Sequence, residues 1–450
     1  MHHQSDKEVK ELSTIKEYLK MTKKSREIHE RAARVFPSGV TRAPFFMLPH
    51  HPFIKRAEGC KVWDVDGNEY LDYVCNMGPL ILGHANPKIR EAILKQLDSG
   101  FLTGGPSELE IELAEKIKVR YPSVEKLQFC PSGTEACMFA MRAIRAYTAK
   151  DKVIATEGAF HGSSESFSKN AGVPKCIQEQ LIRVPFNDAE ALEKKIKENR
   201  GNLAGVFIEP ILGRAGSLAP KDGYLKSVRE ITEKENLPLV FDEVVTGFRL
   251  APGGAAERYG VKPDVAIFGK ILGGGFPCAA FGGTKEIMDV CAYPEGNSLD
   301  NGEPKVTHPG TFNDHKISMA AGAKTLDLLD SAAYEHLEKT GNRIRKELSR
   351  ISAELGIHVE VTGVASMFHI HFTNTKIVDI QSALKANPLL IRYYDMNMLI
   401  RGINLAKYHS NFCSTPLTEK DVDRTLKASQ DTLSAMKPTI REISPNLLTS

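Results

Sequence analysis

Short apolar runs alternate with amphipathic segments through the middle of the chain, from about residue 105 to about residue 325. Apolar residues at helical spacing predict helices over residues 109–119, 134–147, 189–198 and 224–234. The runs between them are apolar enough to be strands buried on both faces of a sheet: 152–155, 204–208, 238–241 and 265–268. Strands that alternate with helices in this way predict an α/β fold with a mostly parallel sheet flanked by helices.

The two ends of the chain have a different pattern, which predicts a smaller α+β domain built from both of them. Residues 60–72 have the pattern of a β-hairpin with Asp66-Gly67 at its turn. After residue 330 the predicted order is helix, strand, strand and helix, over 333–354, 359–362, 366–372 and 419–436. We therefore predict an N-terminal arm and part of the small domain in residues 1–75, a large domain in 76–330 and a C-terminal small domain in 331–450.

The composition is that of an ordinary globular protein, and it argues against several kinds of partner. The 450 residues are 42% hydrophobic and 26% charged, with a formal net charge of +3. A charge this close to balance gives no support for nucleic acid or a membrane surface as a partner. Eight scattered cysteines without a CxxC pair fit reduced thiols, and no secretory signal is seen, so we expect a cytoplasmic protein. No cluster of ligand residues is strong enough to predict a metal site.

Two charged residues follow neighbouring predicted strands. Asp242 ends one apolar run, and Lys270 follows the next run and precedes a glycine run at 273–275. Ligands of open α/β sheets bind at the carboxyl ends of strands. A lysine amine there can form a Schiff base with pyridoxal 5'-phosphate (PLP), and a carboxylate can keep the pyridine nitrogen protonated. Alone, Asp242 reads as a helix cap and Lys270 as a solvated lysine; together they favour a PLP site.

Two further segments have residues that suit this cofactor. Ser132, Gly133 and Thr134 open a predicted helix, where free backbone N–H groups suit a phosphate, although a plain helix cap explains them as well. Phe160 could stack on a planar ring and His161 could support the acid beneath it; the alternative is a core phenylalanine and a satisfied histidine.

At these residues the chain resembles the class-III, fold-type I, PLP-dependent aminotransferases, and within them the subgroup that contains glutamate-1-semialdehyde aminomutase. The resemblance covers about residues 36–325 and continues more weakly to the C-terminus. It is carried by these words in order: Trp63-Asp64-Val65-Asp66-Gly67, Leu82-Gly83-His84, Ser132-Gly133-Thr134-Glu135-Ala136, Phe160-His161-Gly162, Glu209-Pro210, Phe241-Asp242-Glu243-Val244-Val245-Thr246-Gly247-Phe248-Arg249 and Gly269-Lys270.

The resemblance implies a sheet of seven strands in the large domain and a role for individual residues. Lys270 would be the Schiff-base lysine and Asp242 the partner of the pyridine nitrogen. Val244 would pack on the ring face opposite Phe160, while Gly133 and Thr134 would hold the phosphate. Thr311 would reach the phosphate of a neighbouring subunit, which implies a homodimer. Glu209 would lie near the phenolic edge of the ring or on the substrate side.

Four places depart from the aminomutase pattern: the stretch 39–44, Pro131, Phe160 and the stretch 309–316. Thr41-Arg42 and Gly310-Thr311-Phe312-Asn313 look more like β-amino-acid (β-phenylalanine-type) aminotransferases. In that group an arginine matching Arg42 binds a substrate carboxylate, which suits its bidentate fork; the alternative is a structural surface arginine. The resemblance implies an enzyme that moves an amino group from an amino acid, with a β-amino acid as one option, to an oxo-acid. The alternatives are glutamate-1-semialdehyde 2,1-aminomutase and a PLP racemase.

Overall fold

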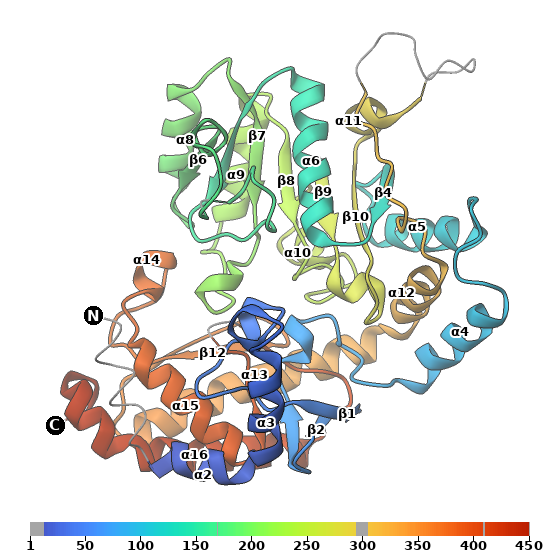
Figure 1. The fold of residues 1–450 in the computed structure, drawn as a ribbon. Helices are drawn as coiled ribbons and strands as arrows, with labels where there is room; N and C mark the ends of the chain where they lie inside the picture. The colour runs from blue at the N-terminus through green and yellow to red at the C-terminus, as the bar shows by residue number, and fades with distance from the viewer. Residues whose placement is uncertain (1–12, 169, 294–304, 408–409, 450) are drawn as a thin grey trace.

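The structure is a computed structural model that describes residues 13–168, 170–293, 305–407 and 410–449. The first twelve residues of the predicted N-terminal arm lie outside the described residues. Figure 1 shows two lobes: an upper one built from the middle of the chain and a lower one in which the blue N-terminal helices lie beside the orange and red C-terminal ones. No helix in the described ranges is long and apolar enough to cross a membrane.

The upper lobe is built on a seven-stranded sheet. The strands, in spatial order, are β4 (Lys126–Cys130), β10 (Ala279–Gly283), β9 (Val265–Phe268), β8 (Leu239–Asp242), β7 (Leu203–Ile208), β5 (Lys152–Thr156) and β6 (Leu181–Val184). Only β10 runs antiparallel to its neighbours, β4 and β9. The carboxyl ends of the other strands therefore lie along one edge of the sheet, as predicted for a mostly parallel α/β fold.

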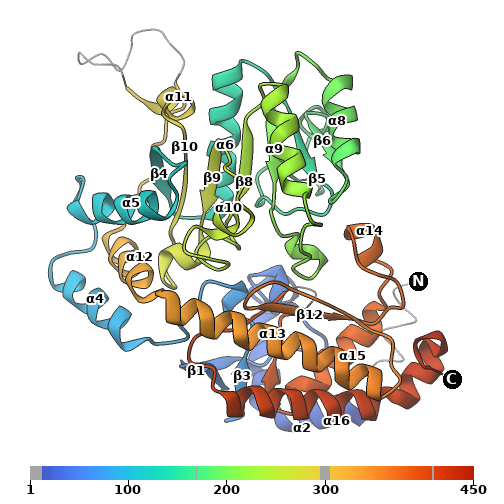
Figure 2. The ribbon, with the colours of Figure 1, turned by 180° about the vertical axis from the view of Figure 1, so that it is seen from behind.

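Helices cover both faces of this sheet because successive side chains of each strand point to opposite faces. On β8, Val240 packs in one apolar cluster with helix α6 (Gly133–Thr148), whereas Leu239 and Phe241 pack in another with α8 (Ala189–Glu198) and α9 (Tyr224–Lys234). Figure 1 has α6 in front of the strands, and Figure 2, from behind, has α9 in front. The other helices of the lobe and its neighbourhood are α4 (Pro87–Asp98), α5 (Glu108–Arg120), α7 (Lys175–Gln178), α10 (Gly254–Tyr259), α11 (Lys285–Met288) and α12 (Lys316–Leu328).

The lower lobe joins the two ends of the chain, which confirms the predicted small α+β domain. Strand β3 (Glu69–Asp72) pairs with β2 (Lys61–Asp64), as the hairpin pattern predicts, and on its other side with β13 (Ile403–Asn404). The remaining strands are β1 (Ile54–Glu58), β11 (Glu360–Thr362), β12 (Met367–His371) and β14 (Asn411–Phe412). The helices are α2 (Ser13–Met21), α3 (Lys23–Ala32), α13 (Ser331–Glu354), α14 (Ile380–Ala383), α15 (Pro388–Ile400) and α16 (Glu419–Ile443). The domain boundaries at 75 and 330 stay predictions.

Three strands of the large sheet, β4, β6 and β10, were not predicted from the sequence. β10 contains two glycines and two alanines, which gives it little strand propensity of its own. It is a strand because β4 and β9 supply hydrogen bonds on both sides. β4 and the edge strand β6 are short and partly polar, so they also lack a clear apolar run. A further difference is at α16, which continues through Pro438 beyond the predicted end at 436, with Ile440 fully buried in its last turns.

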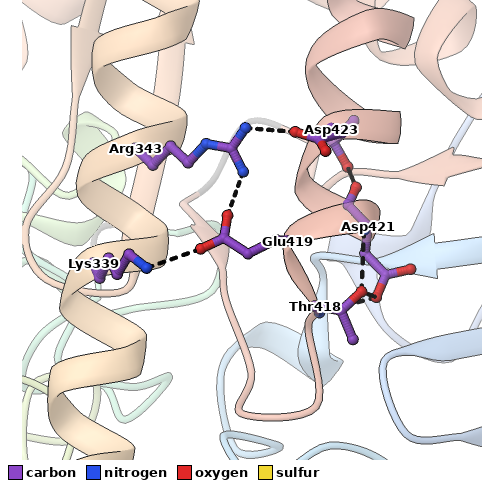
Figure 3. A network of polar contacts seen from close by, with 7 residues as sticks. Lys339, Arg343, Thr418, Glu419, Asp421 and Asp423 are labelled. Atoms are coloured by element: carbon purple, nitrogen blue, oxygen red, sulfur yellow. Dashed lines mark hydrogen bonds and ion pairs between the residues drawn. The ribbon is translucent and has the colours of Figure 1, made fainter.

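Long helices of the small lobe are connected by a network of surface charges (Figure 3). Lys339 and Arg343 on α13 both form ion pairs with Glu419 at the start of α16, and Arg343 also pairs with Asp423. Thr418 caps α16 by accepting a hydrogen bond from the backbone N–H of Asp421. These side chains are mostly exposed, so each ion pair contributes only about 0–1 kcal/mol; the apolar face between the helices holds them together.

Leu113 allows a test of whether packing between α5 and α12 stabilises the upper lobe. It is fully buried on α5, and a Cβ built on Gly322 of α12 would lie 3.2 Å from Leu113 Cδ2. We expect Leu113→Ala to lower the free energy of unfolding by about 3 kcal/mol in denaturant titrations, because it leaves a cavity. Val119→Ala on the same helix, where the side chain is 80% exposed, should change it by less than about 0.5 kcal/mol. Equal losses in both variants would contradict this packing.

Candidate active site

The sheet brings the ends of several parallel strands together where the two lobes meet. Asp242 ends β8 and pairs in register with Ile267 of β9, and Lys270 lies two residues beyond the end of β9. Glu209 follows β7 directly, and Phe160 lies in the loop after β5. Four loops that are distant in sequence thus meet at one edge, as the strand-end rule predicts.

Asp242 is a buried carboxylate with partners on both oxygens. Oδ2 accepts a hydrogen bond from His161 Nδ1 at 2.8 Å, and the Cys137 thiol lies 3.5 Å from the same oxygen. Oδ1 accepts from the backbone N–H of Val244 at 3.0 Å. His161 therefore supports the acid from behind. Because a buried charge is stable only when it is hydrogen-bonded, these contacts keep the carboxylate in place.

A cavity of about 240 Å³ opens in front of Asp242. It brings together seven of the residues predicted for the site: Gly133, Thr134, Phe160, Glu209, Asp242, Val244 and Lys270. Cys137, Gly162 and Val245 complete its lining. Cys137 lies one helical turn after Gly133 and so faces the same side of α6; that spacing is the signal that could have added it to the predicted site.

The start of α6 approaches the cavity closely because small residues surround it. Gly162 has a φ of +85°, and a Cβ added there would lie 2.6 Å from Thr134 Cα. A Cβ on Gly133 would lie 3.1 Å from the Val244 side chain. The helix begins with unpaired backbone N–H groups and the positive end of its dipole, so this end of the cavity favours an anion.

Lys270 and Glu209, two of the ionisable groups of the cavity, have shifted pKa values. Burial lowers the pKa of Lys270, against the opposing effects of the Asp242 and Glu209 charges. Burial, with the charge of Asp242, raises the pKa of Glu209 from its usual 4.5 to about 8. Glu209 is 6% exposed, and its Oε2 accepts a hydrogen bond from the backbone N–H of Phe160 at 3.2 Å. A buried lysine with a lowered pKa beside a buried acid with a raised pKa is typical of a functional site.

Other residues predicted for the site lie outside this cavity. Ser132 is the N-cap of α6 and accepts a hydrogen bond from the backbone N–H of Glu135 at 3.2 Å. Thr311 is exposed in the turn before α12. Arg42 donates to Asn76 Oδ1 at 2.6 Å, and its guanidinium lies 4.6 Å from the Phe45 ring centroid. None of the three lines the cavity of its own chain.

Arg249 is a buried charge near the site that we did not predict to have a role. It is 1% exposed, donates to the carbonyl of Gly78 and to Ser366 Oγ, and lies over the ring of Phe412. A Cβ on Gly78 would lie 3.5 Å from Lys270 Cδ. Arg249 therefore fixes the turn that packs against the lysine. In the part of the chain that the structure describes, no three His, Cys, Asp or Glu side chains gather as metal ligands do.

A family model of the class-III aminotransferases matches residues 47–405. The chain belongs to this family. Glutamate-1-semialdehyde 2,1-aminomutase of Methanococcoides burtonii is 40% identical to this class-III aminotransferase over 421 residues, which cover 90% of this chain and 97% of the relative. Membership of the family implies PLP as the cofactor.

Solved structures of the same family have the same fold as this class-III aminotransferase. An ω-transaminase from Sphaerobacter thermophilus is 33% identical with a TM-score of 0.85, and the match covers 91% of this chain and 97% of that one. A β-phenylalanine aminotransferase from Variovorax paradoxus is 29% identical with a TM-score of 0.87, over 94% and 97% of the two chains.

Gly162 allows a test of whether the start of α6 holds the cofactor. Gly162→Ala pushes a Cβ against Thr134, so we expect the affinity of the apoprotein for PLP to fall by about tenfold or more. Gly172→Ala is the matched control, because Gly172 also has a positive φ, +90°, but has nothing within 4 Å. Fluorescence titration of each apoprotein with PLP measures the affinity. Equal affinities of the two variants would place the phosphate elsewhere.

The raised pKa of Glu209 predicts how the stability of the apoprotein depends on pH. Between about pH 4.5 and about pH 8 the folded protein holds a proton on Glu209 that the unfolded chain has lost, so stability falls as the pH rises. Glu209→Gln removes this proton. Between these pH values the parent should lose more free energy of unfolding than the Glu209→Gln variant does. The difference, measured by urea titration, should be about 1.4 kcal/mol for each unit by which the pKa of Glu209 is raised. The exposed Glu230→Gln variant should follow the parent; a Glu209→Gln curve parallel to the parent's would refute the shift.

Proposed function

We propose that this class-III aminotransferase transfers amino groups of small amino acids on PLP, with Lys270 as the covalent partner of the cofactor and Asp242 as the partner of its pyridine nitrogen. One observation carries the proposal. Asp242, held by His161 and the backbone N–H of Val244, lines the same small cavity as Lys270, whose amine has a lowered pKa. Burying a lysine and an acid in one cavity costs folding free energy, so their meeting there points to a function and not to stability.

The residues that line the cavity fit the cofactor. Gly133 and Thr134 at the start of α6 would hold the phosphate, because their backbone approaches without a bulky side chain. Phe160 and Val244 would pack on the two ring faces, and Glu209 would lie toward the ring's polar edge or the substrate. When bound, PLP supplies an aldehyde that reacts with amines and a protonated ring that accepts an electron pair from the substrate carbon.

Lys270 has two tasks in this proposal. Its Nζ binds the cofactor covalently in the resting enzyme, and once an amine substrate has displaced it, the free amine moves a proton away from and back to the substrate. A lowered pKa keeps more of Nζ unprotonated and able to accept that proton. Asp242, held by His161 and the N–H of Val244, would face the ring nitrogen and keep it protonated.

Two finer activities fit this chemistry. The first is the aminomutase reaction, in which the amino group moves within one substrate. It is favoured by the 40% identity, over almost the whole chain, to a protein named glutamate-1-semialdehyde 2,1-aminomutase.

The second candidate is a transaminase acting on β-amino acids and an oxo-acid. Arg42 supports it, because it lies beside the turn that packs against Lys270 and its fork suits a substrate carboxylate. Two motifs add to this support, Thr41-Arg42 and Gly310-Thr311-Phe312-Asn313. So does the similarity to a β-phenylalanine aminotransferase and an ω-transaminase.

A homodimer is part of the same proposal. Thr311 is exposed on its own chain, next to Phe312, which is 53% exposed. A hydroxyl and an aromatic ring that stand out together suit a contact with a second copy, where Thr311 would reach the partner's phosphate. We also infer a reducing, cytoplasmic setting, because all eight cysteines are free and seven of them are buried.

The central role of Lys270 is tested by trapping the cofactor with borohydride. The parent should keep a PLP-sized mass adduct on the peptide that contains Lys270, and Lys270→Ala should bind PLP without any adduct and lose amino transfer by a factor of at least about 10³. Lys285→Ala, at an exposed position on α11, is the matched control and should behave as the parent. An adduct that persists in Lys270→Ala would assign another lysine.

The two finer activities differ in their need for a second substrate. A transaminase converts β-amino acids only when an oxo-acid accepts the amino group, whereas an aminomutase converts glutamate-1-semialdehyde with no oxo-acid present. We would follow both reactions with the same holoenzyme and with Arg42→Gln. Oxo-acid-dependent conversion that Arg42→Gln weakens by about tenfold or more supports the transaminase; conversion of the semialdehyde alone supports the aminomutase. A holoenzyme inactive with both, and with a wider panel of amines, would end the proposal.

A further inference from the structure

A second cavity adjoins the cofactor cavity on the other side of Phe160. Its volume is about 490 Å³, and Phe160 and Gly162 line both cavities. Its walls come from the loop after β5, from β6, from the turn at 213–215 and from α14 of the small lobe. It is therefore a cleft between the lobes that continues outward from the candidate active site.

Two arginines line this cleft, and neither forms a salt bridge with a carboxylate among the described residues. Arg214 is exposed, its guanidinium lies 5.8 Å from the centroid of the Phe160 ring, and within the described residues it makes no hydrogen bond or ion pair. Arg183 on β6 is half-buried, and its Nη2 donates to the carbonyl of Phe167 at 2.9 Å. Burial lowers the pKa of Arg183; the charge of Glu157 opposes this shift, and the charge of Arg214 adds to it.

The cleft also holds one acid, Glu157, whose carboxylate accepts a hydrogen bond from Gln381 of α14 at 3.3 Å. Its charge acts on Arg183 and opposes the lowering of the pKa of that arginine, although no salt bridge joins the two among the described residues. Among the described residues that line the cleft, two arginines and one glutamate leave one net positive charge, and this balances a single carboxylate. A phosphate dianion would exceed it and would be repelled by Glu157. Two guanidinium forks that face the same space are the arrangement that recognises a carboxylate.

Phe160 connects the cleft to the reacting end of the substrate. Its backbone N–H donates to Glu209 in the cofactor cavity, whereas its ring has Arg214 on the cleft side. A substrate chain that starts at the cofactor cavity and passes the ring of Phe160 reaches the arginines. We propose that Arg214 and Arg183 bind a second carboxylate of the substrate, at the end remote from the transferred amino group, and that the enzyme therefore takes a dicarboxylic amino or oxo acid. This inference rests on the proposed amino transfer.

The test uses the holoenzyme and ligands that cannot react. Succinate, glutarate and adipate carry two carboxylates at increasing separation, and the monoamide of each keeps the shape but has one neutral end. Calorimetry should give at least one dicarboxylate that binds about tenfold more tightly than its monoamide. Arg214→Gln should abolish that preference by weakening the dicarboxylate alone, and Arg214→Lys should restore part of it.

Two controls separate the cleft from a general effect of charge. Arg90→Gln makes the same substitution at an exposed position on α4, outside the cleft, and should leave the preference unchanged. Glu157→Gln removes the acid from the cleft and should increase the affinity for the dicarboxylate. The inference would be overturned if Arg214→Gln and Arg90→Gln bound the dicarboxylate with equal affinity. It would also be overturned if the parent bound no dicarboxylate more tightly than its monoamide.

The result stays distinct from the test of the proposed function. If dicarboxylate binding depends on Arg214 but the holoenzyme converts no amine, the carboxylate site in the cleft is supported and the proposed amino transfer is wrong. If the holoenzyme converts amines but Arg214→Gln does not change dicarboxylate binding, amino transfer is supported and the carboxylate site in the cleft is wrong.

Discussion

The buried charge of Asp242 is the constraint on which the rest of the site depends. A carboxylate at the end of an interior strand is stable only if other groups donate to it. Those groups come from three places: His161 from the loop after β5, Cys137 from α6 and the backbone N–H of Val244 from the following turn. By collecting these partners, the acid fixes the positions of the loop and the helix, and their residues then become the walls of the cavity.

A second buried charge, Arg249, comes from the same connection after β8. Its partners are the Gly78 carbonyl, Ser366 and the ring of Phe412, which belong to the turn at 75–78 and to the small lobe. Among the described residues Arg249 has no carboxylate within salt-bridge distance, so these contacts must compensate its buried charge. Asp242 thus organises the large-lobe side of the cavity and Arg249 attaches the small lobe beside Lys270, so that one short segment determines how both lobes meet the lysine.

Sequence alone predicted the parts of the molecule in which the residue types themselves indicate burial. β7, β8 and β9 are apolar along their whole length because both faces are buried, and Asp242 and Lys270 were recognisable because they end such runs. β10 was missed, since its strand conformation comes from its neighbours and not from its own glycines and alanines.

The roles of other site residues depend on contacts that sequence does not contain. Arg183 lies on the missed edge strand β6, and Arg214 lies in a short turn; only the fold brings both to the cleft that Phe160 also lines. Thr311 and Arg42 have predicted roles that need a second chain or a substrate, so the single chain leaves those roles as predictions.

The pairing of β3 with β13 has a consequence for how the protein is made. Asp72 and Asn404 are 332 residues apart, yet they are joined by backbone pairing and by a side-chain hydrogen bond of 3.1 Å. During synthesis on the ribosome the N-terminal hairpin emerges early and must wait, with one edge unpaired, until nearly the whole chain has been translated. An open strand edge of this kind invites wrong partners. Until β13 has been made, the edge of β3 is therefore a place where the nascent chain can form wrong contacts.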